Sequence, residues 1–238
     1  MFRTAKGALS VGPVPRVAGA LSSLPKKFTR KVSCDIVEVR LDKTSRPADW
    51  LDRCRSIEAT GVPVLLTIRL SAEGGEWSAP DESRLELFQQ GLRHLAAVDV
   101  ELHSVIARVV GKTAAKLGKA CIVSFHDFQK TPPLSRLQAI VRKAQKIGSV
   151  VKISTRIQSE SDLNNLRALL TKKWKCPLCV IGMGADWRET RVSLPLAGSC
   201  LTYGYLDKPT APGQMSAATL SKRLRNALQQ VDAHTASR

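Results

Sequence analysis

Short apolar segments rich in β-branched residues recur along the whole chain, and polar or turn-forming residues bound them. Segments of this length and composition are typical of buried strands. They span residues 16–21, 36–41, 64–69, 98–102, 121–126, 150–154, 179–183 and 200–203. Eight strands that alternate with helices over about this length predict an α/β fold, a (β/α)8 TIM barrel.

Apolar residues at helical spacing fill most of the intervals between these segments. Such stripes run through residues 85–95, 134–144, 163–170 and 220–231. Ser159 and Asp162 have the spacing of a capping box and predict a helix that begins there. The interval 22–34 contains Pro25 and leaves room for only a short helix, so a doubly wound open sheet is the alternative fold. No GxGxxG motif follows a strand, which argues against a dinucleotide-binding version.

No linker, repeat or low-complexity tract divides the chain, so we expect a single domain. Residues 16–233 form the predicted catalytic barrel. Residues 1–15 precede the first strand and could cover one end of the barrel, and residues 234–238 form a C-terminal tail.

Composition supports a folded, strongly basic protein. Of 238 residues 43% are hydrophobic, which is enough to fill a core, and 37 Lys and Arg against 20 Asp and Glu give a net charge of +17. No run of about 18 uncharged apolar residues exists and the N-terminus lacks an apolar signal region, so we expect neither a membrane span nor secretion, and a cytoplasmic location. The basic residues are scattered along helix faces without a nucleic-acid-binding motif, so no specific nucleic-acid partner is expected.

Six cysteines are present, and Cys176 and Cys179 form an isolated CxxC pair. No second pair or nearby histidine completes four zinc ligands. We therefore interpret the cysteines as ordinary core or surface thiols and predict no metal site.

Ionisable residues stand inside or at the ends of several predicted strands, where apolar residues are the norm. They are Glu38, Arg40, Arg69, Asp99, Glu101, His126 and Lys152. Buried charges are costly, so such groups are normally paired or functional, and the active sites of (β/α)8 enzymes lie at the carboxyl ends of the strands. Alternatives remain open for each: Glu38 and Arg40 could form a buried ion pair, and His126 could be a satisfied core histidine. For Asp99 and Glu101 a role as barrel-floor or loop-capping residues is favoured.

Lys152 is harder to explain as a structural residue, because lysine is rarely buried without a task. Schiff-base chemistry needs an uncharged amine, and an environment of other cations disfavours the ammonium form. A strand lysine among Arg40, Arg69 and Arg191 suits that chemistry.

The ordered set of motifs in this chain resembles the type I 3-dehydroquinate dehydratases, the Schiff-base dehydroquinases of the shikimate pathway. The resemblance runs from about residue 11 to residue 216. Its motifs are Glu38-Val-Arg-Leu-Asp42, Thr67-Ile-Arg-Leu-Ser-Ala-Glu-Gly-Gly75, Val98-Asp-Val-Glu-Leu102, Ser124-Phe-His-Asp-Phe128, Val151-Lys-Ile153, Gly182-Met-Gly184 and Ala211-Pro-Gly-Gln214.

The resemblance implies a lyase that converts 3-dehydroquinate to 3-dehydroshikimate, a step of aromatic amino-acid biosynthesis, without a metal or an organic cofactor. Lys152 matches the lysine that forms the imine, His126 the general acid and base, and Glu73 the carboxylate that positions this histidine. The resemblance also implies a homodimer. The residues that match substrate contacts are Glu38, Arg40 and Arg69 for the hydroxyls, Arg191 for the carboxylate, and Thr210 and Gln214 on the closing loop.

Three positions depart from the family pattern. Thr210 stands where a serine is often found, Tyr203 where phenylalanine is common, and Ala20 where some members have a serine. Two other functions remain as alternatives: a class I Schiff-base aldolase on the same barrel, and a non-catalytic basic barrel that binds nucleic acid. The hydroxyl and carboxylate contacts, with the pairing of His126 and Glu73, favour the dehydratase.

Overall fold

The eight predicted strand segments form one sheet of parallel strands in the computed structural model, which describes residues 1–28, 32–209 and 213–236. Neighbouring strands pair in parallel throughout this sheet. In their order across the sheet the strands are β10 (Leu201–Tyr205), β3 (Arg16–Leu21), β4 (Ile36–Arg40), β5 (Val64–Thr67), β6 (Ala97–Glu101), β7 (Ala120–Asp127), β8 (Val150–Arg156) and β9 (Leu178–Met183).

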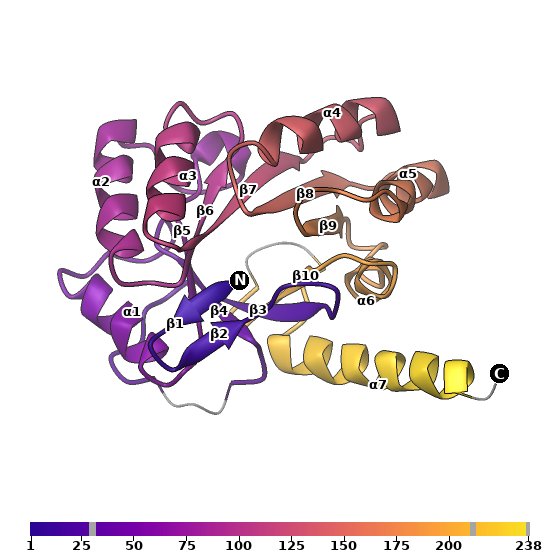
Figure 1. Ribbon diagram of the computed structural model, residues 1–238, viewed down its shortest axis with the longest axis horizontal. Helices are drawn as coiled ribbons and strands as arrows, with labels where there is room; N and C mark the ends of the chain where they lie inside the picture. Colours follow the sequence, from indigo (N-terminus) through magenta and orange to yellow (C-terminus); the bar gives the residue numbers. More distant parts are fainter. Residues whose placement is uncertain (29–31, 210–212, 237–238) are drawn as a thin grey trace.

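The first and last strands of this order, β10 and β9, meet at a seam that closes the sheet. The Cys200 amide donates to the Leu178 carbonyl oxygen at 2.9 Å, and the Val180 amide donates to Oγ of Ser199 at 2.8 Å. The sheet therefore curls into a nearly closed barrel surrounded by helices (Figure 1). This arrangement confirms the predicted (β/α)8 barrel, and the open-sheet alternative is wrong.

Seven α-helices lie in the described part of the chain, one after each strand from β4 onward. They are α1 (Trp50–Glu58), α2 (Asp81–Leu92), α3 (Ala107–Lys116), α4 (Leu134–Ala144), α5 (Glu160–Thr171), α6 (Thr190–Leu196) and α7 (Ala217–Ala236). Between β3 and β4 the described residues contain no helix, and residues 29–31 of that interval are outside the described ranges. Helix α7 continues past residue 233, where the sequence predicted the C-terminal tail to begin.

The helices follow the predicted apolar stripes. In α4, Leu137, Ile140, Val141 and Ala144 are buried, and in α5 the Ser159 hydroxyl accepts from the Asp162 amide at 3.3 Å, which confirms the predicted cap. The Asp162 carboxylate accepts from the Gln158 amide at 2.9 Å rather than from Ser159. None of the helices in the described ranges is both long and apolar enough to cross a membrane.

The two faces of the strands belong to different environments, because successive side chains alternate across a sheet. Val37, Val98 and Val151 belong to the large apolar cluster shared with the helices. Ile36, Ala97 and Val150 belong to a second cluster. The second cluster takes inward-facing residues mainly from the amino-terminal halves of the strands, so it fills that end of the barrel, and it reaches the cavity through Ile181 and Tyr203.

The N-terminal segment forms a hairpin of β1 (Phe2–Thr4) and β2 (Gly7–Leu9). The side chain of Phe2 is fully buried in the second cluster. The hairpin therefore packs at the amino-terminal end of the barrel and leaves the carboxyl ends of the strands accessible.

Candidate active site

A polar cavity of about 100 Å³ opens at the carboxyl ends of the strands. Eight of the nine residues selected from the sequence line it: Glu38, Arg40, Arg69, Glu73, His126, Lys152, Arg191 and Gln214. The ninth, Thr210, lies outside the described residues. Phe128, Ser154, Ile181, Met183 and Tyr203 complete much of the wall.

Strand register brings the polar residues together from distant parts of the sequence. Ser124 pairs in register with both Lys152 and Glu101, and Thr67 pairs with Asp99. Thr67, Asp99, Ser124 and Lys152 each stand two positions beyond a residue of the second apolar cluster, and Glu101 stands four beyond one, so a period of two places them on the same inward side of the strands, above that cluster. The polar cluster is thus a direct consequence of alternation along parallel strands.

Lys152 lies at the base of the cavity and is 6% exposed. Its Nζ lies 3.1 Å from Oδ2 of Asp99 and 4.2 Å from the centre of the Tyr203 ring. The three arginines expected near Lys152 do line the same cavity, but a carboxylate that was not expected there directly faces the amine. A carboxylate and an aromatic face both stabilise a positive charge on nitrogen, whether ammonium or iminium.

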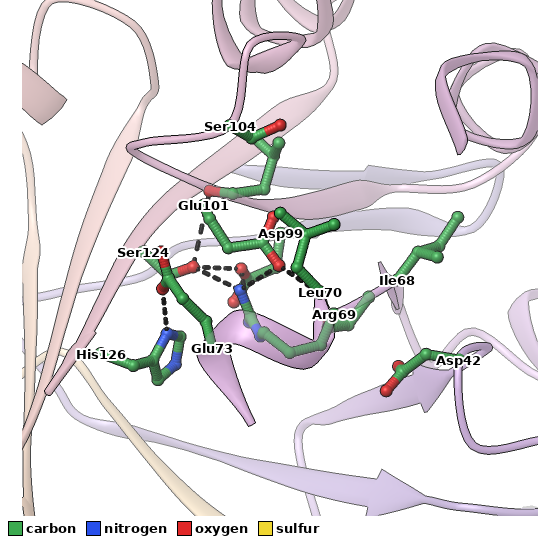
Figure 2. Close-up of polar contacts among 12 residues, drawn as sticks. Asp42, Ile68, Arg69, Leu70, Glu73, Asp99, Glu101, Ser104, Ser124 and His126 are labelled. Carbon is green, nitrogen blue, oxygen red and sulfur yellow. Dashed lines mark hydrogen bonds and ion pairs between the residues drawn. The ribbon is translucent and has the colours of Figure 1, made fainter. Parts of the chain in front are cut away.

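Arg69 holds Asp99 from the other side. One guanidinium nitrogen of Arg69 donates to Oδ1 of Asp99 at 2.7 Å, and the other donates to Oγ of Ser124 at 2.7 Å and lies 3.2 Å from Oε1 of Glu101 (Figure 2). Burial alone would raise the pKa of Asp99, but Arg69 and Lys152 outweigh it and hold this pKa well below its usual value. Asp99 is therefore a permanent anion beside Lys152.

The favoured interpretation of Asp99 and Glu101 as barrel-floor or loop-capping residues was only partly correct. Glu101 does accept from the Leu70 amide at 2.9 Å, as a loop-capping residue would. Both carboxylates are also fully buried ion-pair partners of Arg69. Asp99 contacts the candidate nucleophile directly, so it belongs to the site.

His126 and Glu73 form a hydrogen-bonded pair in which Nδ1 lies 2.9 Å from Oε2 (Figure 2). Burial, with Arg69 and Lys152 nearby, holds the pKa of His126 well below its usual value, so the imidazole is neutral. Burial raises the pKa of Glu73 to about 7. An ionised Glu73 accepts the proton on Nδ1 and leaves the other ring nitrogen as a base.

Local backbone geometry places this pair. Glu73 ends the short 3-10 helix η1 (Ser71–Glu73), and Gly74 follows it with a φ of 76°. The Phe128 ring stacks on the His126 ring with centroids 6.1 Å apart. A side chain at Gly74 would collide with that Phe128 ring. The glycine therefore lets the loop approach close enough for Glu73 to reach His126.

Glu38 and Arg40 do not form the ion pair that was left open as an alternative. Glu38 accepts from the Thr67 hydroxyl at 2.8 Å. Arg40 makes a two-pronged contact with Asp42, at 3.0 Å through Nε and 2.8 Å through a terminal nitrogen. Both side chains border the cavity with their positions fixed by these neighbours.

Arg191 comes from α6 and is 7% exposed. A terminal nitrogen donates to the Tyr203 carbonyl oxygen at 3.2 Å, and no carboxylate of the described residues pairs with it. Desolvation lowers its pKa to about 10, so the group remains a cation at neutral pH. A buried guanidinium without an acidic partner, facing a cavity, is suited to an anionic ligand.

Asp99, Ser124 and Phe128 were not predicted to have a functional role, although all three belong to the motifs that carry the family resemblance. The signal that could have found Asp99 was the register of β5 to β8, which places it between Arg69 and Lys152. Tyr203 was noted only as a departure from the family, and its ring lies directly against Lys152. In the described part of the chain no three His, Cys, Asp or Glu side chains are grouped so as to hold a metal ion.

Comparisons with known proteins agree with this geometry. A family profile described as Type I 3-dehydroquinase matches residues 14–231. A 3-dehydroquinate dehydratase of Methanothrix thermoacetophila is 38% identical over 194 residues, which cover 80% of this chain and 81% of that protein. One of Methanocella arvoryzae is 32% identical over 214 residues, which cover 90% and 96%.

Solved structures lead to the same family. The crystal structure of the 3-dehydroquinate dehydratase from Aquifex aeolicus VF5 superposes with a TM-score of 0.77 and 25% identity, over 88% of this chain and 97% of that one. Because the profile and both relatives cover most of the sequence, this chain belongs to the type I 3-dehydroquinase family and is an enzyme of the hydro-lyase class.

Proposed function

We propose that this chain dehydrates 3-dehydroquinate to 3-dehydroshikimate through an imine between Lys152 and the substrate ketone. The observation that carries the proposal is one cavity that holds both a buried lysine amine and the hydrogen-bonded pair of His126 and Glu73. An amine is the nucleophile of Schiff-base chemistry, and an imidazole with a low pKa is a base at neutral pH.

The reaction begins when the uncharged Lys152 amine adds to the ketone carbon. The carbonyl oxygen takes one proton from the amine and one from solvent and leaves as water, which forms an iminium. The nearby Asp99 carboxylate and Tyr203 ring stabilise this cation. His126 then removes a proton from the neighbouring carbon, and the electron pair moves onto the iminium nitrogen to form an enamine. Glu73 stabilises the imidazolium that results.

The enamine returns its electron pair and expels the β-hydroxyl group, which takes the proton from His126 and departs as water. Hydrolysis of the remaining iminium consumes one water, releases the unsaturated ketone and returns one proton to solvent, which restores the Lys152 amine. The net change is the loss of one water from the substrate. A base that returns the proton it removed contributes about 10²- to 10⁴-fold to the rate.

Substrate orientation is assigned to the cavity wall. Arg191 is placed to bind the carboxylate, since it has no acidic partner among the described residues. Glu38, Arg40 and Arg69 also line the cavity and present hydrogen-bonding groups for the hydroxyls, and Gln214 lines it as well. Thr210 is assigned to the same cavity from the family resemblance alone.

The decisive experiment is borohydride reduction in the presence of 3-dehydroquinate, followed by peptide mass analysis. We expect one reduced ligand on Lys152, because hydride fixes the imine as a stable amine. Lys152→Met should abolish the adduct, and Lys130→Met, which removes an exposed lysine, should retain it. An enzyme that turns over without an adduct at Lys152 would contradict the imine mechanism.

His126→Ala separates the two steps. It should still form the adduct, because imine formation uses Lys152, and it should lose turnover by about 10²- to 10⁴-fold. Turnover at the original rate would remove His126 from its assigned role.

Two further expectations rest on the family resemblance. We propose that the chain acts as a homodimer and that it works in the cytoplasm. Light scattering of the purified protein measures the first, and both stay predictions.

A further inference from the structure

A buried row of alternating charges connects Lys152 to helix α2, on the outside of the barrel. Lys152 lies 3.1 Å from Asp99, and Asp99 lies 2.7 Å from Arg69. Arg69 lies 3.2 Å from Glu101, and Glu101 lies 2.9 Å from Arg84. All five side chains are less than a tenth exposed. Low local dielectric strengthens every contact in such a row.

Arg84 ends this row, and it is fully buried although it belongs to a helix. One terminal nitrogen donates to Oε2 of Glu101 at 2.9 Å and to the Ile68 carbonyl oxygen at 3.2 Å. The other donates to the Ser104 hydroxyl, and Nε lies 3.0 Å from Oδ1 of Asp81. Arg84 therefore connects α2 to the carboxyl ends of β5 and β6, and it does not line the cavity.

Glu101 is shared between two guanidinium groups. Oε1 faces Arg69 and the Leu70 amide (Figure 2). Oε2 faces Arg84. Arg84 pairs with the Glu101 carboxylate on the side away from Arg69 and balances part of its charge. Arg69 can therefore direct its second terminal nitrogen to Asp99. Without Arg84 the buried carboxylate would have only Arg69 as a cationic partner.

We propose that Arg84 is a positioning residue for the active site, acting through Glu101 to keep Arg69 on Asp99 and to balance the charge around the pair of His126 and Glu73. The proposal rests on the proposed function for its effect on turnover, and on the row of contacts alone for its effect on the charge balance. No part of it requires Arg84 to touch the substrate.

The charged groups around the pair determine the direction of the effect. Besides burial, Glu101 and Asp99 raise the pKa of Glu73 and Arg69 lowers it. Arg69, Lys152 and Arg40 lower the pKa of His126, and Asp99 raises it. Removal of the Arg84 charge leaves this environment more negative, so both groups should bind a proton more readily.

The test compares Arg84→Met with the unsubstituted enzyme in the pH dependence of kcat/KM and in the NMR titration of His126 without substrate. We expect the acid limb and the histidine midpoint to move to higher pH by about half a unit to one unit. Arg93→Met removes an exposed arginine just after the same helix and should move neither midpoint. Unchanged midpoints in a folded Arg84→Met protein would overturn the proposal.

Glu101→Gln tests the same row from its centre and remains informative if Arg84→Met fails to fold. It removes a negative charge, so both midpoints should move to lower pH. In Arg84→Met/Glu101→Gln both changes should offset, with the midpoints close to the original. The row of contacts would be only structural if the two midpoints moved in the same direction in Arg84→Met and in Glu101→Gln. The same conclusion would follow if the variants changed in stability and neither midpoint moved.

The two proposals fail differently. If the unsubstituted enzyme does not dehydrate 3-dehydroquinate, the proposed function fails, while the histidine titration still decides the role of Arg84. If turnover is present and the titration midpoints do not respond, the role of Arg84 fails alone.

Discussion

Arg191 carries a charge inside the protein without a charged partner among the described residues, and this has a cost. A buried guanidinium loses much of its hydration, and one carbonyl oxygen at 3.2 Å replaces only part of it. Neighbouring cations of the site differ in this respect, since Arg40 pairs with Asp42 and Arg69 with Asp99. We therefore interpret the Arg191 guanidinium as a group that binds an anionic ligand, which would supply the missing negative charge.

Arg191→Met should therefore weaken substrate binding without weakening the fold. Loss of a charge-assisted contact with the carboxylate costs about 2–3 kcal/mol, so KM should rise roughly 30- to 150-fold. The thermal midpoint should not fall, because a desolvated cation is replaced by an apolar side chain of similar length. Steady-state kinetics and thermal unfolding measure the two effects.

Arg188→Met is the matched control, since Arg188 is exposed one helical turn away and pairs with Glu189 at the surface. It should leave KM unchanged. An unchanged KM in Arg191→Met would contradict the assigned role.

For individual residues, the sequence predicted which side chains line the site better than it predicted which side chains they contact. Charges in strands pointed to Lys152, His126 and Arg69, because such positions normally hold apolar residues. The contact of Asp99 with Lys152 and the burial of Arg84 depend on register between strands and on helix placement. These relations join residues far apart in the chain, and no local pattern encodes them.

The loop after β5 illustrates how an element as a whole positions the site. Its two glycines, Gly74 and Gly75, allow a turn that brings Glu73 against His126. A Cβ at Gly75 would lie 2.0 Å from the Arg69 carbonyl oxygen, which is a backbone atom and cannot rotate away. The Trp77 amide donates to that same oxygen at 3.1 Å, so the turn is fastened at this point.

Gly75→Ala should consequently displace the turn and separate Glu73 from His126. We expect a loss of turnover of at least tenfold and a loss of stability greater than that of Gly118→Ala, the control. Gly118 has a φ of 64° with open space around its Cβ position, so its substitution costs only backbone strain, about 1 kcal/mol. Chemical denaturation of both variants gives the comparison, and equal losses would contradict the steric argument.

Elements with a strong local pattern were predictable from the sequence. The eight strands and the helix capped by Ser159 match their predicted positions to within a few residues. The weak point was the interval between β3 and β4, where Pro25 interrupts the pattern and the described residues form no helix. At the start of this interval the Ser22 and Ser23 amides donate to the Asp207 carboxylate, a contact far away in the sequence that no local pattern predicts.

For the whole molecule, the two ends of the barrel have separate tasks. The carboxyl ends of the strands surround the cavity, whereas the other end is filled by apolar residues that include Phe2 of the hairpin. We propose that residues 1–15 act as the cover of that end, as the sequence suggested.

Phe2→Ala should destabilise the protein by about 3–5 kcal/mol, the usual cost of removing a buried phenyl ring. Activity per folded molecule should remain unchanged, because the hairpin and the cavity are at opposite ends. Val14→Ala, at a position 53% exposed, is the control and should have little effect on stability. Denaturation curves with kinetics on the folded fraction measure both, and an unchanged stability would contradict the cover.

The seam between β9 and β10 has a consequence for motion. Elsewhere the barrel wall is a continuous ladder of backbone hydrogen bonds. In the described residues one backbone hydrogen bond, from Cys200 to Leu178, crosses this seam, and the side chains of Ser199 and Cys179 bridge it further. Amide protons along this junction should exchange with solvent sooner than those of β7 and β8. The Arg191 guanidinium is hydrogen-bonded to Tyr203 on β10, whereas Lys152 lies on β8. Transient opening of this junction should therefore displace Arg191 while Lys152 keeps its position.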